Sequence, residues 1–165
     1  MTTRLAAGMA TISEVAQWSS SADSSTSPAP KWRLPLVMLV EDDAAVAQMY
    51  KLGLEAAGFE VAVLEDGSAL FTAIDSQIPD IVILDFHLQG LLTGIDIAEN
   101  LRLDERFGRL PVLFLSNEFN VSEEETDRAS GVGALAWLAK SRTSPSQLAT
   151  RITEALDSCK TEGSC

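Results

Sequence analysis

From Leu34 onward, short continuous apolar runs alternate with longer segments that are apolar on one helical face. The runs lack a regular polar alternation, which is typical of parallel strands covered on both faces of a sheet. The first intervening segment places Val46, Met49, Tyr50 and Leu54 at helical spacing. Because strands and helices alternate, the pattern predicts an α/β fold of the (βα)5 type, with one doubly wound, parallel, five-stranded sheet in a single domain.

Caps and breakers define the bounds of these elements. Gly58 is expected to end the first helix and Pro79 the second, whereas Asp66, Ser122 and Ser144 are typical N-cap residues. The strands are expected at 36–41, 59–64, 81–84, 111–116 and 134–139. The helices are expected at 44–57, 66–78, 94–103, 122–131 and 144–159. Nothing after the last helix is long enough for a second domain.

Residues 1–33 differ from the rest in composition. In the stretch 18–30, Ser, Thr, Ala and Pro dominate, and Asp23 is the one charged residue. Such a segment buries too little apolar surface to offset the chain entropy lost on ordering. We therefore expect a disordered Ser/Pro-rich N-terminal arm over residues 1–33, a folded domain over 34–160 and a flexible tail over 161–165.

The chain is acidic, with a formal net charge of -12 and a pI near 4.4. Nucleic-acid binding requires Lys and Arg clustered on one face, so this balance argues against it. No apolar stretch approaches the roughly 20 residues that span a bilayer, and the N-terminus does not have the pattern of a signal peptide. We therefore expect a cytoplasmic protein that does not insert into membranes.

Polar residues that can do chemistry follow four of the apolar runs. Glu41 and Asp42 follow the first run, Asp85 the third, Ser116 the fourth and Lys140 the fifth. The carboxyl ends of parallel strands share one edge of the sheet, where ligands bind, so we expect these side chains in one crevice. Carboxylates this close need a cation, and their oxygens suit Mg²⁺. With the ammonium and the hydroxyl, the crevice suits a phosphoryl group, which an aspartate can accept.

Four segments resemble the receiver domain of two-component response regulators, the CheY-like family with a flavodoxin-like fold. They are LVEDD at 39–43, PDIVILD at 79–85, PVLFLS at 111–116 and GALAWLAK at 133–140. Each segment is weak alone, but their order and spacings are typical of the family. The resemblance extends from about Leu34 to Cys159 and implies a phosphoprotein of a two-component phosphorelay.

The resemblance implies a role for each charged residue of the crevice. Asp85 would be the phosphoacceptor. Glu41 and Asp42 would be the acid pair that holds Mg²⁺ together with Asp85, and the main-chain carbonyl of His87 would complete the protein ligands. Lys140 would pair with the aspartyl phosphate.

The resemblance also implies how a signal enters and leaves the domain. The phosphoryl donor would be a histidine kinase or a histidine phosphotransfer protein. Ser116 would then reorient to bond a phosphate oxygen, and Trp137 stands at the position of the family's switch aromatic. The signal would leave through the fourth helix, fifth strand and fifth helix to a protein target that the sequence does not identify. The domain is expected to be stand-alone, a monomer or a phosphorylation-dependent dimer, and not an enzyme beyond its own phosphorylation and dephosphorylation.

Simpler explanations compete with some of these assignments. Asp43 is expected to cap the first helix rather than bind metal. The ring of His87 could be a ligand, but its motif position uses the backbone, and Trp137 could be an ordinary packed strand residue. The alternative function is a receiver-like interaction module that is not phosphorylated. A phosphatase of the haloacid-dehalogenase class would need an aspartate at position 87, and a flavodoxin-like cofactor binder would need a hydroxyl- and Gly-rich phosphate loop in place of EDDAA.

Three positions depart from the common receiver pattern. Ser141 stands where the family usually has proline, and because a non-proline cis bond costs ~2.5–4 kcal/mol, the Lys140–Ser141 bond is expected to be trans. The loop after Asp85 is one residue longer than usual and carries Gln89 in place of proline, which would alter access to the site. Asn117 stands where the family prefers a small residue and is expected to shield an acyl phosphate from water.

Overall fold

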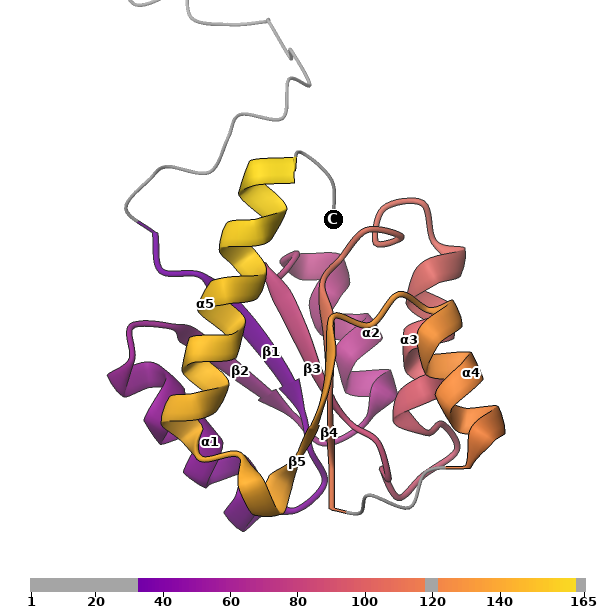
Figure 1. The fold of residues 1–165 in the computed structure, drawn as a ribbon, viewed down its shortest axis with the longest axis horizontal. Coiled ribbons are helices and arrows are strands. Elements are labelled where there is room, and N and C mark those ends of the chain that lie inside the picture. Colours follow the sequence, from indigo (N-terminus) through magenta and orange to yellow (C-terminus); the bar gives the residue numbers. More distant parts are fainter. Residues whose placement is uncertain (1–32, 118–121, 163–165) are drawn as a thin grey trace, which may run out of the picture. The chain divides into compact units, whose positions relative to one another are not determined.

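Five parallel strands form the sheet at the centre of the domain (Figure 1). The computed structural model describes residues 33–117 and 122–162. The strand order is β2-β1-β3-β4-β5, and each neighbouring pair is parallel. The strands are β1 (Leu36–Val40), β2 (Glu60–Leu64), β3 (Ile81–Asp85), β4 (Val112–Ser116) and β5 (Ala136–Ala139). This arrangement confirms the predicted doubly wound (βα)5 fold.

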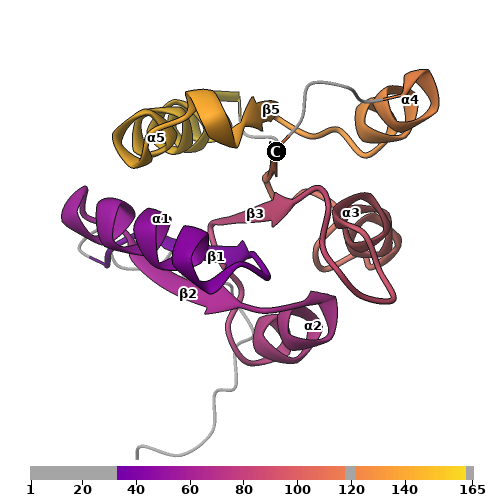
Figure 2. The ribbon, with the colours of Figure 1, turned by 90° about the horizontal axis from the view of Figure 1, so that it is seen from below.

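Helices cover both faces of the sheet, α1 and α5 on one face and α2, α3 and α4 on the other (Figure 2). The helices are α1 (Ala44–Ala56), α2 (Gly67–Ser76), α3 (Gly94–Leu103), α4 (Glu123–Gly131) and α5 (Pro145–Glu162), and a short 3-10 helix, η1 (Lys140–Arg142), follows β5. In β1, Val37 and Leu39 belong to one core and Met38 and Val40 to the other, so side chains on both faces are buried. This burial explains why the strands are continuous apolar runs.

Several helix ends lie where the cap residues predicted them. The carboxylate of Asp43 accepts hydrogen bonds from the first turn of α1, as expected for a cap. Ser122 begins α4 in a capping box with Glu125. Gly58 follows α1 with a φ of 93°, a conformation that glycine adopts readily.

Three predicted bounds differ from the structure by two residues or more. Helix α2 ends at Ser76 because Gln77 is already extended, with a ψ of 119°. Ile78, the last residue of the helix predicted at 66–78, lies beyond α2 and is 55% exposed. Strand β5 begins only at Ala136, and α5 continues to Glu162.

The segment after β5 contains the 3-10 turn η1, which was not predicted. Every peptide bond in the described residues is trans, which confirms the prediction for Lys140–Ser141. No helix in 33–117 or 122–162 is both long and apolar enough to cross a membrane. The arm predicted over residues 1–33 lies outside the described residues apart from Arg33, as do 163–165 of the predicted tail.

Candidate functional site

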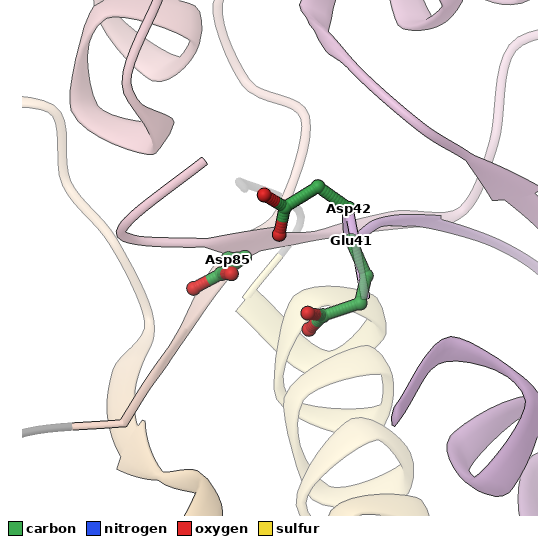
Figure 3. Close-up of side chains that lie close together, drawn as sticks. All are labelled: Glu41, Asp42 and Asp85. Atoms are coloured by element: carbon green, nitrogen blue, oxygen red, sulfur yellow. The ribbon is translucent and has the colours of Figure 1, made fainter. Parts of the chain in front are cut away.

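The ends of β1 and β3 bring three carboxylates together (Figure 3). Asp85 is the last residue of β3, and Glu41 follows β1 directly. One carboxylate oxygen from each of Glu41, Asp42 and Asp85 lies within 4.8 Å of the other two. Glu41 and Asp85 are only 1% and 2% exposed. Asp42 is exposed, so the cluster opens to solvent at this residue.

The ammonium group of Lys140 lies between the two buried carboxylates. Its Nζ is 2.6 Å from one carboxylate oxygen of Glu41 and 2.8 Å from the other. It is also 2.9 Å from Oδ2 of Asp85. Only 6% of the Lys140 side chain is exposed. The end of β5 therefore supplies a fixed positive charge to the site.

Burial and charge act on these groups in opposite directions. Burial raises the pKa of Glu41, although the hydrogen bond from Lys140 opposes this, and the charge of Asp85 raises the pKa further. Burial by itself would lower the pKa of Lys140, but the hydrogen bonds to Glu41 and Asp85 outweigh it and raise the pKa above its usual value. Lys140 is therefore firmly charged at neutral pH, while Glu41 takes up a proton more readily than an exposed glutamate does.

His87 and Ser116 complete the surroundings of Asp85. The main-chain N–H of His87 donates to Oδ1 of Asp85 at 3.1 Å, so both oxygens of this carboxylate have a donor. The hydroxyl of Ser116, a residue that is 0% exposed, lies 3.5 Å from Nδ1 of the His87 ring. The predicted hydroxyl is therefore at the site, with the imidazole beside it.

The loop after Asp85 folds back over the acid pair. The main-chain N–H of Gln89 donates to Oδ2 of Asp42 at 3.2 Å. Proline has no N–H and could not form this bond. At the far end of the loop, a Cβ on Gly94 would overlap the main-chain oxygen of Asp85, so the close approach requires glycine. The Gln89 side chain is exposed, and this residue contacts the site through its main-chain N–H.

Trp137 packs in an aromatic cluster with Phe86 and Phe114. Its ring centroid is 4.4 Å from that of Phe86 and 5.7 Å from that of Phe114. Phe86 directly follows Asp85 in the chain and packs against Trp137, so Phe86 connects the indole ring to the residue that carries the carboxylate. The indole is half-buried, and its role as a switch stays a prediction. Asn117 is exposed beside Ser116.

Two contacts between segments far apart in the chain were not predicted. The hydroxyl of Tyr50 in α1 donates to the main-chain oxygen of Thr143, just past η1, at 2.9 Å. Arg128 of α4 reaches Asp96 at 2.7 Å and Glu99 at 2.8 Å, both in α3. The sequence placed Tyr50 on the apolar face of its helix, and local periodicity carries no information about a partner far along the chain.

The carboxylate cluster fits a Mg²⁺ ion. Such an ion is bound through one or two carboxylates and keeps several waters, and the exposed Asp42 gives water access to the cluster. Two buried acids of like charge, Glu41 and Asp85, share the site, and a divalent cation would relieve their repulsion. The arrangement can therefore hold an oxyanion between a metal ion and an ammonium group, next to the Asp85 carboxylate.

Comparisons with known proteins agree with this chemistry. The family model described as "Response regulator receiver domain" matches residues 37–153. The phosphate regulon transcriptional regulatory protein PhoB of Rhizobium meliloti (strain 1021) is 32% identical over 131 residues, which cover 78% of this chain and 55% of that protein. The DNA-binding response regulator MtrA of Mycobacterium tuberculosis (strain ATCC 25618 / H37Rv) is 38% identical over 80 residues, which cover 48% of this chain and 33% of that protein. The chain thus spans about half the length of these relatives, or less.

Solved structures cover the same region. The Vibrio cholerae chemotaxis protein CheY4, crystallised at low pH, is 26% identical, with a TM-score of 0.67 over 74% of this chain and 98% of that chain. The signal receiver domain of a modulated diguanylate cyclase from Desulfovibrio desulfuricans G20 is 29% identical, with a TM-score of 0.68 over 78% of this chain and 98% of that chain. Both comparisons match nearly the whole of the solved chain.

Proposed function

Because the chain belongs to the response regulator receiver domain family, we propose that Asp85 accepts a phosphoryl group from a histidine kinase or a histidine phosphotransfer protein in a Mg²⁺-dependent reaction. The observation that carries this proposal is the setting of the Asp85 carboxylate. One of its oxygens lies 2.9 Å from Nζ of Lys140, and two further acids lie within 4.8 Å. A nucleophile, a cation and a group of metal-binding oxygens are the parts that phosphoryl transfer requires.

The side chains of the site have separate tasks in this transfer. An oxygen of Asp85 would attack phosphorus, and the new P–O bond would form as the P–N bond to the donor imidazole breaks, with the leaving nitrogen taking up a proton. Lys140 would move its contact from the Asp85 carboxylate to a phosphoryl oxygen. The hydroxyl of Ser116 would donate to a second phosphoryl oxygen. Both donors act where negative charge develops, which is where fixed dipoles and charges lower a barrier most.

The residues proposed to hold the metal are Glu41, Asp42 and Asp85, with the main-chain carbonyl of His87. Bound Mg²⁺ would neutralise negative charge on the phosphoryl oxygens. Asp42 is the exposed member of the set, and the Gln89 N–H restrains one of its oxygens. The loop after β3 thus contributes to the metal site through an orienting hydrogen bond.

Phosphorylation would be transmitted from the site by packing. When Ser116 bonds the phosphate, the space beside Trp137 changes, and the indole would shift a pre-existing equilibrium between two conformations. The outward face for this signal is α4, β5 and α5, which would contact a protein target or, in a phosphorylation-dependent dimer, a second copy.

The proposal also covers what the domain does not do. It would act on no substrate other than its own acyl phosphate, it would bind no nucleic acid, and it would work in the cytoplasm. PhoB and MtrA are named as a transcriptional regulator and a DNA-binding protein, and the regions matched are only part of each.

Incubation with acetyl phosphate and Mg²⁺, followed by intact-mass spectrometry, tests the proposal. The wild type should gain the mass of one phosphoryl group, and Asp85→Asn should gain none. Asp75→Asn is the matched control, because Asp75 is an exposed acid on α2 that forms an ion pair with Arg106. Failure of the wild type to gain mass, with the fold intact by circular dichroism, would favour the receiver-like module that is not phosphorylated.

A further inference from the structure

One buried hydroxyl group has no part in the proposed chemistry. Tyr50 is 0% exposed, and its hydroxyl donates to the main-chain oxygen of Thr143 at 2.9 Å. Thr143 is itself only 9% exposed. Burial, followed by the nearby charge of Glu41, raises the pKa of Tyr50, so the hydroxyl keeps its proton and remains a donor. The Tyr50 hydroxyl and the Thr143 carbonyl are thus hydrogen-bonded to each other in a buried place where water is not available to either.

Thr143 is tied directly to the lysine of the site. The main-chain N–H of Thr143 donates to the main-chain oxygen of Lys140 at 3.4 Å and closes the turn η1. Hydrogen bonds therefore run from the backbone of Lys140 through Thr143 to Tyr50. A second close approach lies one helical turn further along α1, where a Cβ on Gly53 would overlap the side chain of Pro145.

The same helix is anchored at the acid pair. Helix α1 begins at Ala44, its cap Asp43 directly follows Glu41 and Asp42, and it lies beside α5 on one face of the sheet (Figures 1 and 2). One rigid element therefore contacts both the acids and the segment that carries Lys140. The chain has Ser141 and not proline after Lys140, with a trans peptide bond, so no proline ring restrains this segment.

We propose that Tyr50 is a positioning residue for Lys140: its hydroxyl, bonded to the Thr143 carbonyl, holds η1 so that the ammonium stays between Glu41 and Asp85. The inference rests on the proposed function in that Lys140 assists phosphoryl transfer. Loss of the hydroxyl would leave the Thr143 carbonyl without its buried donor, and the turn would gain freedom to move. The backbone that carries the three acids does not depend on this turn, so the metal ligands would stay in place and their affinity for Mg²⁺ would change only slightly.

Tyr50→Phe tests the proposal, because it removes only the hydroxyl. The rate constant of phosphorylation at saturating acetyl phosphate and Mg²⁺ should fall about fivefold, the effect expected for one buried hydrogen bond. The dissociation constant for Mg²⁺ should change less than twofold. Asp80→Ala is the control for stability, since it removes the acceptor of the Leu36 N–H, a 2.7 Å bond at the amino end of β1, away from Lys140. At equal loss of thermal stability, this control should keep the wild-type rate constant.

A second measurement does not need phosphorylation. In protein labelled with ¹⁵N-lysine, the Nζ signal of Lys140, identified by its absence in Lys140→Met, should be protected from exchange in the wild type and in Asp80→Ala. It should weaken in Tyr50→Phe. If the wild type gains no phosphate, the proposed function fails, and this signal alone decides the role of Tyr50. An unchanged signal in Tyr50→Phe, or equal rate losses in Tyr50→Phe and Asp80→Ala, would overturn the proposal.

Discussion

Removing the ammonium of Lys140 should destabilise the domain strongly, and the loss should depend on pH. The substitution Lys140→Met keeps most of the side-chain volume and removes the charge. It leaves the carboxylates of Glu41 and Asp85, which are 0% and 3% exposed as side chains, without their shared partner. The structure thus predicts an uncompensated pair of buried negative charges.

The expected magnitude follows from the distances. Two unit charges about 5 Å apart repel each other by roughly 3 kcal/mol at an effective dielectric constant of about 20. Removal of one member of a buried ion pair costs about 3–5 kcal/mol in general. We therefore expect Lys140→Met to lower the free energy of unfolding by about 3–5 kcal/mol at pH 7 without Mg²⁺. A typical domain has about 5–15 kcal/mol in total, so the loss is large but compatible with folding.

The dependence on pH has a definite sign. Burial already raises the pKa of Glu41, and loss of Lys140 removes a hydrogen bond that lowers it, so the pKa rises further. A proton on Glu41 relieves the repulsion. The deficit of the variant should therefore be complete above the raised pKa of Glu41 and should shrink as the pH falls through it. Saturating Mg²⁺ should shrink it as well, because the cation replaces the lost charge.

Urea denaturation at pH 7 and pH 5, with and without Mg²⁺, measures these effects. Lys51→Met is the matched control, since Lys51 is a partly exposed lysine of α1 that pairs with the exposed Glu55, and it should change stability by less than about 0.5 kcal/mol. Adding Asp85→Asn to Lys140→Met should recover part of the loss. A deficit below about 1 kcal/mol, or one that stays constant with pH and Mg²⁺, would refute the account of Lys140 as the counter-charge of the site.

Three further predictions concern residues around the site. Asn117→Ala should shorten the half-life of the acyl phosphate, because the exposed Asn117 side chain beside the site is expected to exclude water, and a half-life that is equal or longer would contradict this. Gly94→Ala should lower the free energy of unfolding by about 1–3 kcal/mol, because its Cβ would overlap the main-chain oxygen of Asp85; an unchanged urea midpoint would speak against it. Arg128→Met should raise the pKa of Asp96, because the hydrogen bond from Arg128 holds this pKa below its usual range. The lowered pKa stabilises the wild type at pH values above the usual carboxyl pKa, and the variant should lose this contribution. Identical NMR titration curves of Asp96 in the two proteins would exclude this.

The meeting of the site residues could be predicted because parallel pairing fixes where strands end. Val40 pairs with Leu84 across β1 and β3, so Glu41, which follows β1, lies beside Asp85, which ends β3. Ser116 pairs with Ala139 across β4 and β5, which brings Lys140 to the same edge. An apolar run followed by a polar residue is visible in the sequence, and once the runs are taken as parallel strands, the common edge follows.

The segments beyond the strand ends obey no such rule. Ile78 continues the apolar spacing of the helix predicted at 66–78, but α2 has already ended at Ser76 and the Ile78 side chain is exposed. The turn η1 begins at Lys140, and its start has no side-chain cap and no helix-breaking residue by which it could be predicted. In such segments the backbone forms hydrogen bonds with groups that are close in space but distant in the chain. The spacing of apolar residues along the sequence carries no information about these partners.

Gln89 shows how such a segment can change a site without contributing a side chain to it. The extra length of the loop after β3 was visible in the sequence, but its effect was expected to be one of access. The structure gives the loop a second effect, because the Gln89 N–H donates to Asp42, the one exposed acid of the cluster. A hydrogen bond to one carboxylate oxygen restrains the direction of the other, and this orients a ligand before the metal arrives. The loop after β3 and helix α1 thus act on the site in similar ways. The Gln89 N–H orients Asp42 from a position where the family usually has proline. The Tyr50 hydroxyl orients Lys140, and Ser141 stands where the family usually has proline after this lysine.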